Sequence, residues 1–136
     1  MASRPIAARK RAPQDRPKYY DLNLLNLPMP GLVSIFHRIT GVTMFLFLIP
    51  LVLWIFQTTL RSPESFAVWK GYFANPLMKL IVVGFIWAFV HHLFAGMRYL
   101  LLDLHIGIAK EPAQRSAKVV LIAGILATAI LAVRIW

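Results

Sequence analysis

The chain contains 22 consecutive uncharged residues, ITGVTMFLFLIPLVLWIFQTTL, at positions 39–60 between Arg38 and Arg61. A helix of this length crosses the roughly 30 Å hydrocarbon core of a bilayer. A water-soluble domain would interrupt such a run with polar residues on a helical or strand period. Hydrophobic residues make up 59% of the whole chain, so the chain is strongly apolar outside this run as well. We therefore predict an integral membrane protein.

Two more apolar blocks follow the first, and together they predict an all-α membrane protein with three transmembrane helices. Pro50 lies inside the first span, which should either kink there or compensate locally for the missing N–H. The segment RSPESFAVWKGYFANP after the first span is expected to be a short polar loop. The three spans are expected at about 32–60, 76–102 and 117–136.

The basic residues predict the orientation of these spans in the membrane. Segments 1–30 and 104–118 carry nine Lys and Arg residues, whereas the loop between the first two spans carries two. Because positive residues are retained on the cytoplasmic side, we expect the N-terminus in the cytoplasm. The chain then divides into a basic cytoplasmic tail, 1–30, and a three-helix transmembrane domain, 31–136. The expected location is a bacterial inner membrane, with the mitochondrial inner membrane as the less favoured alternative.

Charge and cysteine content exclude several other functions. The formal net charge of +10 lies in the tail and at the ends of the apolar blocks, where membrane topology explains it, so no nucleic-acid partner is expected. The chain has no cysteine, which excludes disulfides, thiolate metal sites and covalent attachment of haem.

Two adjacent histidines, His91 and His92, lie about ten residues inside the second span. At 1.5 Å per residue they are roughly 15 Å deep, near the middle of the bilayer. An imidazole there needs a partner, because an unpaired polar group in hydrocarbon is costly. One interpretation is a neutral histidine that hydrogen-bonds to a neighbouring helix.

The neighbours of the two histidines favour a second interpretation, a haem ligand. Residues four apart share a helix face, and the face of His92 carries the small residues Gly84, Ala88 and Gly96. Small residues permit close helix packing, but a flat macrocycle needs both clearance and a nitrogen ligand. His91 instead shares a bulky face with Trp87, Phe94 and Arg98. We therefore predict His92 as the axial ligand and His91 as a packing or hydrogen-bonding residue.

The stretch SIFHRITG, residues 34–41, opens the first span with Ser34, His37, Arg38 and Gly41 on one helix face. Arg38 is either a simple membrane anchor or a ligand-binding cation. With His37 it would pair the propionates of a haem, and with Ser34 it would hydrogen-bond a quinone carbonyl. Iron with two axial histidines needs a second ligand, and because only His92 is both deep and suitably surrounded, a partner membrane subunit is expected to supply it.

The motifs S-x-x-H-R-x-[ST]-G and H-x-x-x-G-x-R…D, in three spans after a basic tail, make the chain resemble the cytochrome b membrane-anchor subunit of succinate dehydrogenase. The resemblance implies that His92 ligates haem b, that Ser34 and Arg38 face ubiquinone, and that His37 and Arg38 approach the haem propionates. It also implies three partners: a second small anchor that supplies the other axial histidine, an iron–sulfur subunit and a flavoprotein. Membrane lipid surrounds the anchors, and electrons from succinate pass to ubiquinone.

Some residues and functions remain open at this point. Asp103 matches an aspartate of the family and serves either proton delivery or the capping of a helix junction. The family often has a histidine directly after its motif arginine, whereas this chain has Tyr99 after Arg98. One alternative function is a proton-conducting or transport subunit in which His91, His92 and Arg98 form a relay. The others are a fumarate reductase anchor, which uses related architecture, and a purely structural anchor.

Overall fold

The computed structural model describes residues 27–136, which form helices and contain no strand. In chain order these are α1 (Met29–Thr43), the π-helix η3 (Met44–Leu48), α2 (Ile49–Thr59), α3 (Pro63–Ala74), α4 (Pro76–Asp103) and α5 (Lys110–Ile135).

Three helical stretches in this part of the chain are long and apolar enough to cross a membrane: Met29–Thr59, Pro76–Asp103 and Lys110–Ile135. The predicted fold class, an all-α protein with three transmembrane helices, is confirmed. The third span was expected to begin at about residue 117, but its helix, α5, begins at Lys110. The additional first turn is charged. Residues 1–26 of the predicted basic tail lie outside the described residues, and the cytoplasmic N-terminus stays a prediction.

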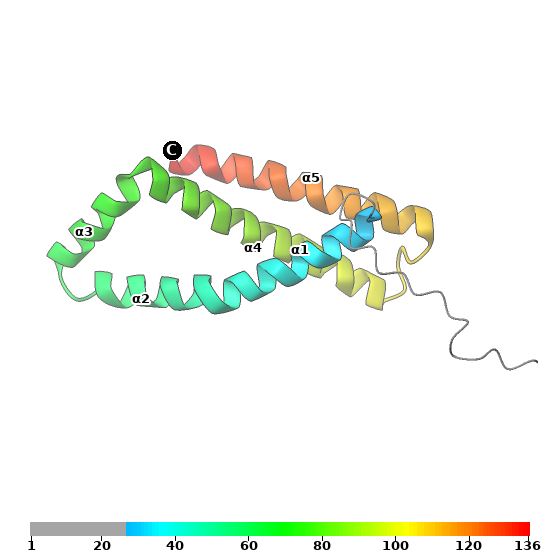
Figure 1. Ribbon diagram of the computed structural model, residues 1–136, viewed down its shortest axis with the longest axis horizontal. Coiled ribbons are helices and arrows are strands. Elements are labelled where there is room, and N and C mark those ends of the chain that lie inside the picture. The colour runs from blue at the N-terminus through cyan, green and yellow to red at the C-terminus, as the bar shows by residue number, and fades with distance from the viewer. Residues whose placement is uncertain (1–26) are drawn as a thin grey trace, which may run out of the picture.

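The first long helix continues through Pro50 because a π-helical turn precedes it. Proline lacks an N–H group and its ring crowds the carbonyl four residues earlier, which usually breaks a helix. In η3 the hydrogen bonds span five residues, and the Ile49 N–H donates to the carbonyl of Met44. The wider turn accommodates the ring, so α1, η3 and α2 form one continuous helix (Figure 1). The π-helical turn is thus the local compensation that the sequence predicted for the missing N–H of Pro50.

Helix α4 lies at the centre of the bundle, with α5 along one side and α1 crossing it on another (Figure 1). The core at these crossings consists of the small or β-branched residues Val33, Ala95, Ala117 and Val120. Small side chains let the helix backbones approach closely, which is how helices pack in the absence of a hydrophobic driving force. Beyond the crossing, α2 diverges from α4, and α3 connects their ends.

The expectation of a polar loop after the first span is wrong, because residues 63–74 form α3. Ser62 caps this helix: its hydroxyl accepts from the Ser65 N–H at 3.2 Å, and its own N–H donates to the Ser65 hydroxyl at 3.2 Å. Pro63 occupies the first helical position, where its missing N–H costs nothing. The indole N–H of Trp69 donates to the Thr58 hydroxyl at 2.8 Å, which fixes α3 against the end of α2.

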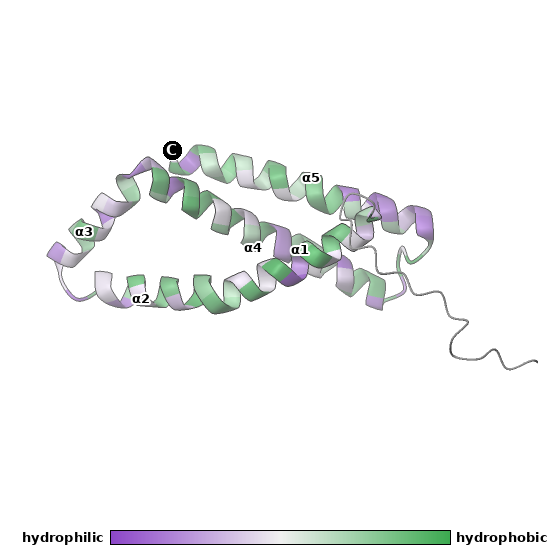
Figure 2. Cartoon of the chain, in the orientation of Figure 1, coloured by the Kyte–Doolittle hydropathy of each residue, from purple (hydrophilic) through white to green (hydrophobic). Residues whose placement is uncertain are grey.

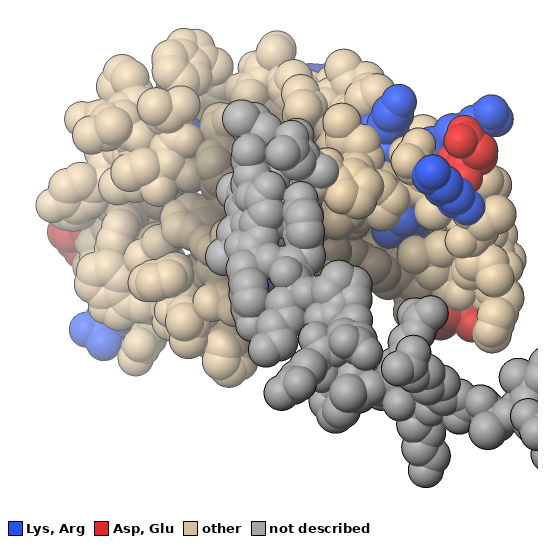
Figure 3. Space-filling model, turned by 45° about the vertical axis from the view of Figure 1, so that its right-hand side comes forward, with Lys and Arg blue, Asp and Glu red and all other residues tan. Residues whose placement is uncertain are grey.

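The surface of the described chain is suited to lipid rather than to water. Hydrophobic residues predominate along η3 and α2 (Figure 2). The side chains exposed there include Phe45, Phe47, Leu53, Trp54 and Phe56. Charged side chains gather at the end where α4 joins α5, and a few lie at the other end (Figure 3). A soluble protein rarely exposes an apolar surface of this extent, so the pattern supports a membrane-spanning domain.

Candidate functional site

The candidate site lies where α1 crosses α4, and its centre is a pair of stacked histidines. The rings of His37 and His92 lie 4.0 Å apart between centroids and are inclined by 13°. The Nδ1 atom of His92 is 3.1 Å from the carbonyl oxygen of His37 and 3.3 Å from the hydroxyl of Thr40. Two residues of α1 thus hold one edge of the imidazole of His92.

These contacts determine which nitrogen of His92 can bind a ligand. The Thr40 hydroxyl has carbonyl acceptors at 2.8 Å, on Phe36, and at 3.1 Å, on His37. A carbonyl can only accept, and a hydroxyl that donates to a carbonyl has lone pairs left to accept, so both contacts favour a proton on Nδ1 of His92. The lone pair is then on Nε2, for which the structure describes no hydrogen bond within residues 27–136. This arrangement is typical of a metal-binding histidine, whose other nitrogen is held by a carbonyl.

His91 lies in a different environment from its neighbour. Its side chain is 0% exposed, and neither ring nitrogen has a hydrogen-bond partner within residues 27–136. Its ring stacks on Trp87 at 5.4 Å and meets the edge of Phe36 at 5.9 Å. A Cβ atom at Gly124 of α5 would lie 3.8 Å from the Cα of His91, so the helices pack closely here. His91 is therefore enclosed within this chain, whereas His92 is partly exposed.

The glycine that makes room for His92 is Gly41, on α1. A Cβ atom at this position would lie only 2.9 Å from Cε1 of His92. Sequence reasoning placed Gly41 on the functional face but missed this contact, which depends on the register of α1 against α4. The small residues on the face of His92 serve different purposes: Gly84 borders open space, Ala88 is buried, and Gly96 faces the ring of His37. Helix packing thus explains part of the pattern that suggested clearance for a macrocycle.

Ser34 and Arg38 lie one turn apart on α1, on either side in sequence of His37, one of the two residues that hold His92. Ser34 is half-buried and Arg38 is exposed. The structure brings together two of the predicted site residues, His37 and His92, whose rings stack. Ser34 and Arg38 lie on the same helix as His37, within one turn of it, and a shared site with His92 stays a prediction.

Tyr99, about two turns beyond His92 on α4, also lies next to this cluster. Its ring lies 5.1 Å from that of His37, and the guanidinium of Arg98 lies 5.6 Å from its centroid. The Tyr99 hydroxyl is buried without a hydrogen-bond partner among the described residues. It is an available donor beside His37.

Arg98 occupies a structural position between α4 and α5, whereas Asp103 makes no described contact that would define its role. Arg98 is 5% exposed; its Nε donates to the Ser116 hydroxyl at 2.9 Å and its Nη2 to the Ala113 carbonyl at 3.2 Å, both on α5. Asp103 is exposed at the last position of α4, and the first turn of α5 has no side-chain cap, so the capping role gains no support.

We expect Arg98→Lys to destabilise the protein by roughly 2–4 kcal/mol, because lysine cannot reproduce two charge-assisted hydrogen bonds in a fixed fork. The measurement is the midpoint of thermal unfolding of the purified assembly, monitored as the loss of intact complex with temperature. The control is Arg115→Lys, at an exposed position of α5, which should not change the midpoint of thermal unfolding. Equal midpoints for both variants would contradict a structural role for Arg98.

Among residues 27–136 no cluster of three or more His, Asp or Glu side chains could hold a metal ion by itself. A single histidine with one nitrogen held by a carbonyl fits a different kind of site, in which a porphyrin provides four ligands and another chain provides the sixth. The donor set at the α1–α4 crossing therefore fits a shared haem.

Comparison with known proteins agrees with this geometry. The chain is 33% identical over 117 residues to the succinate dehydrogenase cytochrome b556 subunit of Paracoccus denitrificans. The aligned stretch covers 86% of this chain and 88% of that protein. It is also 33% identical over 122 residues to the subunit of the same name from Coxiella burnetii, with coverage of 89% and 97%. A family model described as the succinate dehydrogenase/fumarate reductase transmembrane subunit matches residues 12–132. With both motifs, three membrane helices and a match over most of its length, this chain belongs to the succinate dehydrogenase/fumarate reductase transmembrane subunit family.

Proposed function

We propose that this chain is a membrane-anchor subunit of a succinate:ubiquinone oxidoreductase. It shares one haem b with a second small anchor subunit, contributes to the ubiquinone site, and attaches the iron–sulfur subunit and the flavoprotein to a bacterial inner membrane. The printed names of two relatives, each a cytochrome b556 subunit of succinate dehydrogenase, support this assignment at the level of the complex and the pigment.

The observation that carries the haem assignment is the environment of His92. Its Nδ1 lies 3.1 Å from the His37 carbonyl, so Nε2 retains the lone pair for iron. Its side chain is partly exposed at a helix crossing, as a ligand shared between two chains requires. Haem b, when bound, supplies reversible one-electron transfer. His37 and Arg38 would hold its propionates, because a cation pairs carboxylates strongly in a low-dielectric medium.

The quinone assignment depends on Ser34 and Arg38. Their shared face on α1 offers a hydroxyl and a guanidinium to one carbonyl oxygen of ubiquinone. Reduction of ubiquinone consumes two electrons and two protons and places negative charge on the carbonyl oxygens before protonation. Arg38 would stabilise this charge, and Ser34 would donate a hydrogen bond or pass a proton.

The proton-relay alternative gains no support from the contacts. No hydrogen bond within residues 27–136 connects His91, His92 and Arg98, and both nitrogens of His91 are unpaired. A fumarate reductase anchor shares the same family description and differs in the direction of electron flow.

The proposal is tested by isolating the assembly through a tag on this chain from cells that produce all subunits. We expect a flavoprotein, an iron–sulfur protein and a second small membrane protein to copurify. A reduced-minus-oxidised spectrum should show the α-band of a b-type haem, and succinate should reduce ubiquinone. Isolation without pigment or flavoprotein, or proton conduction by the pigment-free chain in vesicles, would overturn the assignment.

Substituting Gly41 tests the position of His92 directly. In Gly41→Ala the new methyl group would lie 2.9 Å from Cε1 of His92, so the imidazole has to move away from its place beside α1. We expect haem content per complex to fall severalfold, measured from the α-band against protein. The control is Gly71→Ala on α3, where nothing lies within 4 Å of a new Cβ, and haem content should not change. Full haem content in Gly41→Ala would show that His92 is not held against α1 in the assembly.

A further inference from the structure

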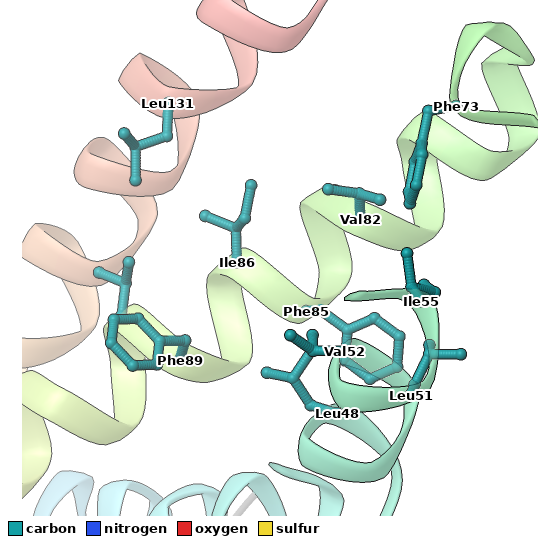
Figure 4. Close-up of a pocket in the computed structure, with 11 residues that line it drawn as sticks. Leu48, Leu51, Val52, Ile55, Phe73, Val82, Phe85, Ile86, Phe89 and Leu131 are labelled. Carbon is teal, nitrogen blue, oxygen red and sulfur yellow. The ribbon is translucent and has the colours of Figure 1, made fainter. Parts of the chain in front are cut away.

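The divergence of α2 from α4 leaves an apolar wedge of about 420 Å³ on the side of the bundle connected by α3 (Figure 4). Aliphatic and phenylalanine side chains alone line it, and they come mainly from α2 and α4, with Phe73 from α3 and Leu131 from α5. Figure 4 shows Leu48 and Val52 close to the ring of Phe85, and Ile86 further along α4 on the side of Leu131. The wedge offers no hydrogen-bonding side chain to an occupant.

A second pocket, of about 410 Å³, adjoins the wedge and shares Phe73 and the α2–α3 corner with it. This pocket differs in chemistry, because Thr59, Trp69 and Lys70 line it beside apolar residues. Trp69 is fixed by its hydrogen bond to Thr58, and tryptophan prefers the interface between lipid tails and headgroups. The two pockets meet at Phe73, so an apolar interior and a cationic, interfacial end lie on either side of one side chain.

The charge of Lys70 at this end is not neutralised by its own helix. Glu64, the acidic residue of α3, lies six residues earlier, which places it about 240° around the helix, and it does not line either pocket. Lys70 is exposed, so its ammonium group can reach an anion in the headgroup region.

Size and chemistry decide between three occupants. A partner helix is about 10 Å across and would fill the wedge with apolar side chains only, which leaves the exposed lysine of the adjoining pocket without a partner. A quinone ring needs hydrogen-bond donors, which the wedge lacks. A flexible hydrocarbon chain fits a narrow apolar wedge, and a phosphate fits the cationic end.

We propose that the wedge and the adjoining pocket bind one anionic phospholipid of the surrounding bilayer. One acyl chain lies between α2 and α4, and the phosphate lies against Lys70. The bound lipid fills the space that the crossing of the helices leaves open and so keeps α2 and α4 at their observed separation. This site is independent of the haem and quinone assignment, because no residue of that site lines it.

The test uses the purified whole complex and counts retained phospholipids by native mass spectrometry after exchange into mixed phosphatidylglycerol and phosphatidylcholine. We expect the unaltered complex to retain one phosphatidylglycerol. Ile86→Trp fills the wedge and should lower retention at least fivefold, whereas Leu53→Trp, on the exposed face of α2, should not. Lys70→Gln should reduce the preference for phosphatidylglycerol about fivefold, and Arg61→Gln, which lines neither pocket, should leave it unchanged.

Photo-crosslinking of the unaltered complex provides a second measurement that needs no variant to assemble. Phosphatidylglycerol with a diazirine in one acyl chain should label the α4 peptide that contains Phe85 and Ile86. Labelling of a partner subunit's helix in contact with this peptide instead, retention of quinone rather than phospholipid, or equal retention in Ile86→Trp and Leu53→Trp would each overturn the proposal.

Discussion

Replacing His92 with alanine is expected to reduce haem b in the isolated complex to less than a tenth of its normal content. The substitution removes the only imidazole that combines a position at the α1–α4 crossing, partial exposure and an Nδ1 held at 3.1 Å by a backbone carbonyl. A carbonyl-held histidine is a far better ligand than a water molecule, and the remaining axial histidine alone holds iron weakly. The measurement is the α-band of the reduced-minus-oxidised spectrum per mole of complex.

The matched control is His91→Leu, one residue earlier on the same helix. The side chain of His91 is 0% exposed and, among residues 27–136, its nitrogens make at most a weak contact with the backbone of Val33, so the substitution removes no well-formed hydrogen bond. Replacing an unpaired buried polar group with an apolar group of similar size is neutral or stabilising. We expect most of the haem to remain and the unfolding midpoint to stay the same or rise. The reverse result, with pigment kept in His92→Ala and lost in His91→Leu, would mean that α4 is turned by about 100° in the assembly.

These two adjacent histidines show how much of the site follows from the sequence. A rotation of about 100° per residue on a helix separates the faces of His91 and His92, and the bulky and small neighbours on those faces predicted His91 as a packing or hydrogen-bonding residue and His92 as a ligand. The same reasoning placed Ser34, His37 and Arg38 on one face, because local helical geometry alone decides it. The structure encloses His91 beside Trp87 and leaves His92 partly exposed, in agreement with that interpretation.

Features that depend on how two helices meet were not predictable in the same way. The contact between Gly41 and His92 requires the register of α1 against α4, and no spacing within one helix encodes it. The pairing of Arg98 with Ser116 depends in the same manner on how α5 packs. Gly84 and Gly96, which the helical period placed on one face, consequently have different neighbours: Gly84 borders open space and Gly96 lies next to His37.

The error at α3 has a local cause and was avoidable. A low content of long apolar runs suggested a loop, but Ser62, Pro63 and Ser65 form a helix start that can be read from the sequence. Three spans were predictable from run length because the bilayer imposes that length on any crossing helix. No such constraint applies to a short helix outside the spans, so capping residues are the better indicator there.

Replacing Arg38 with leucine is expected to lower kcat/KM for ubiquinone about 100- to 1,000-fold, the loss typical of removing one donor to a developing negative charge. Arg38→Lys should recover part of this, because lysine keeps the charge but loses the planar fork. Ser34→Ala should cost about tenfold, as expected for one neutral hydrogen bond. Succinate oxidation with a water-soluble artificial acceptor should be unchanged in all three, and Arg115→Leu, exposed on α5, is the control.

The haem content of Arg38→Leu separates the two tasks proposed for this side chain. If Arg38 mainly binds the quinone, the activity falls while the α-band per complex stays near normal, because His92 and its carbonyl contact with His37 are intact. If it mainly pairs the haem propionates, pigment and activity fall together, and raising the quinone concentration restores nothing. If both the quinone kinetics and the haem content are unchanged, Arg38 is a simple membrane anchor. Such an exposed cation at the membrane boundary can be replaced without loss of either function.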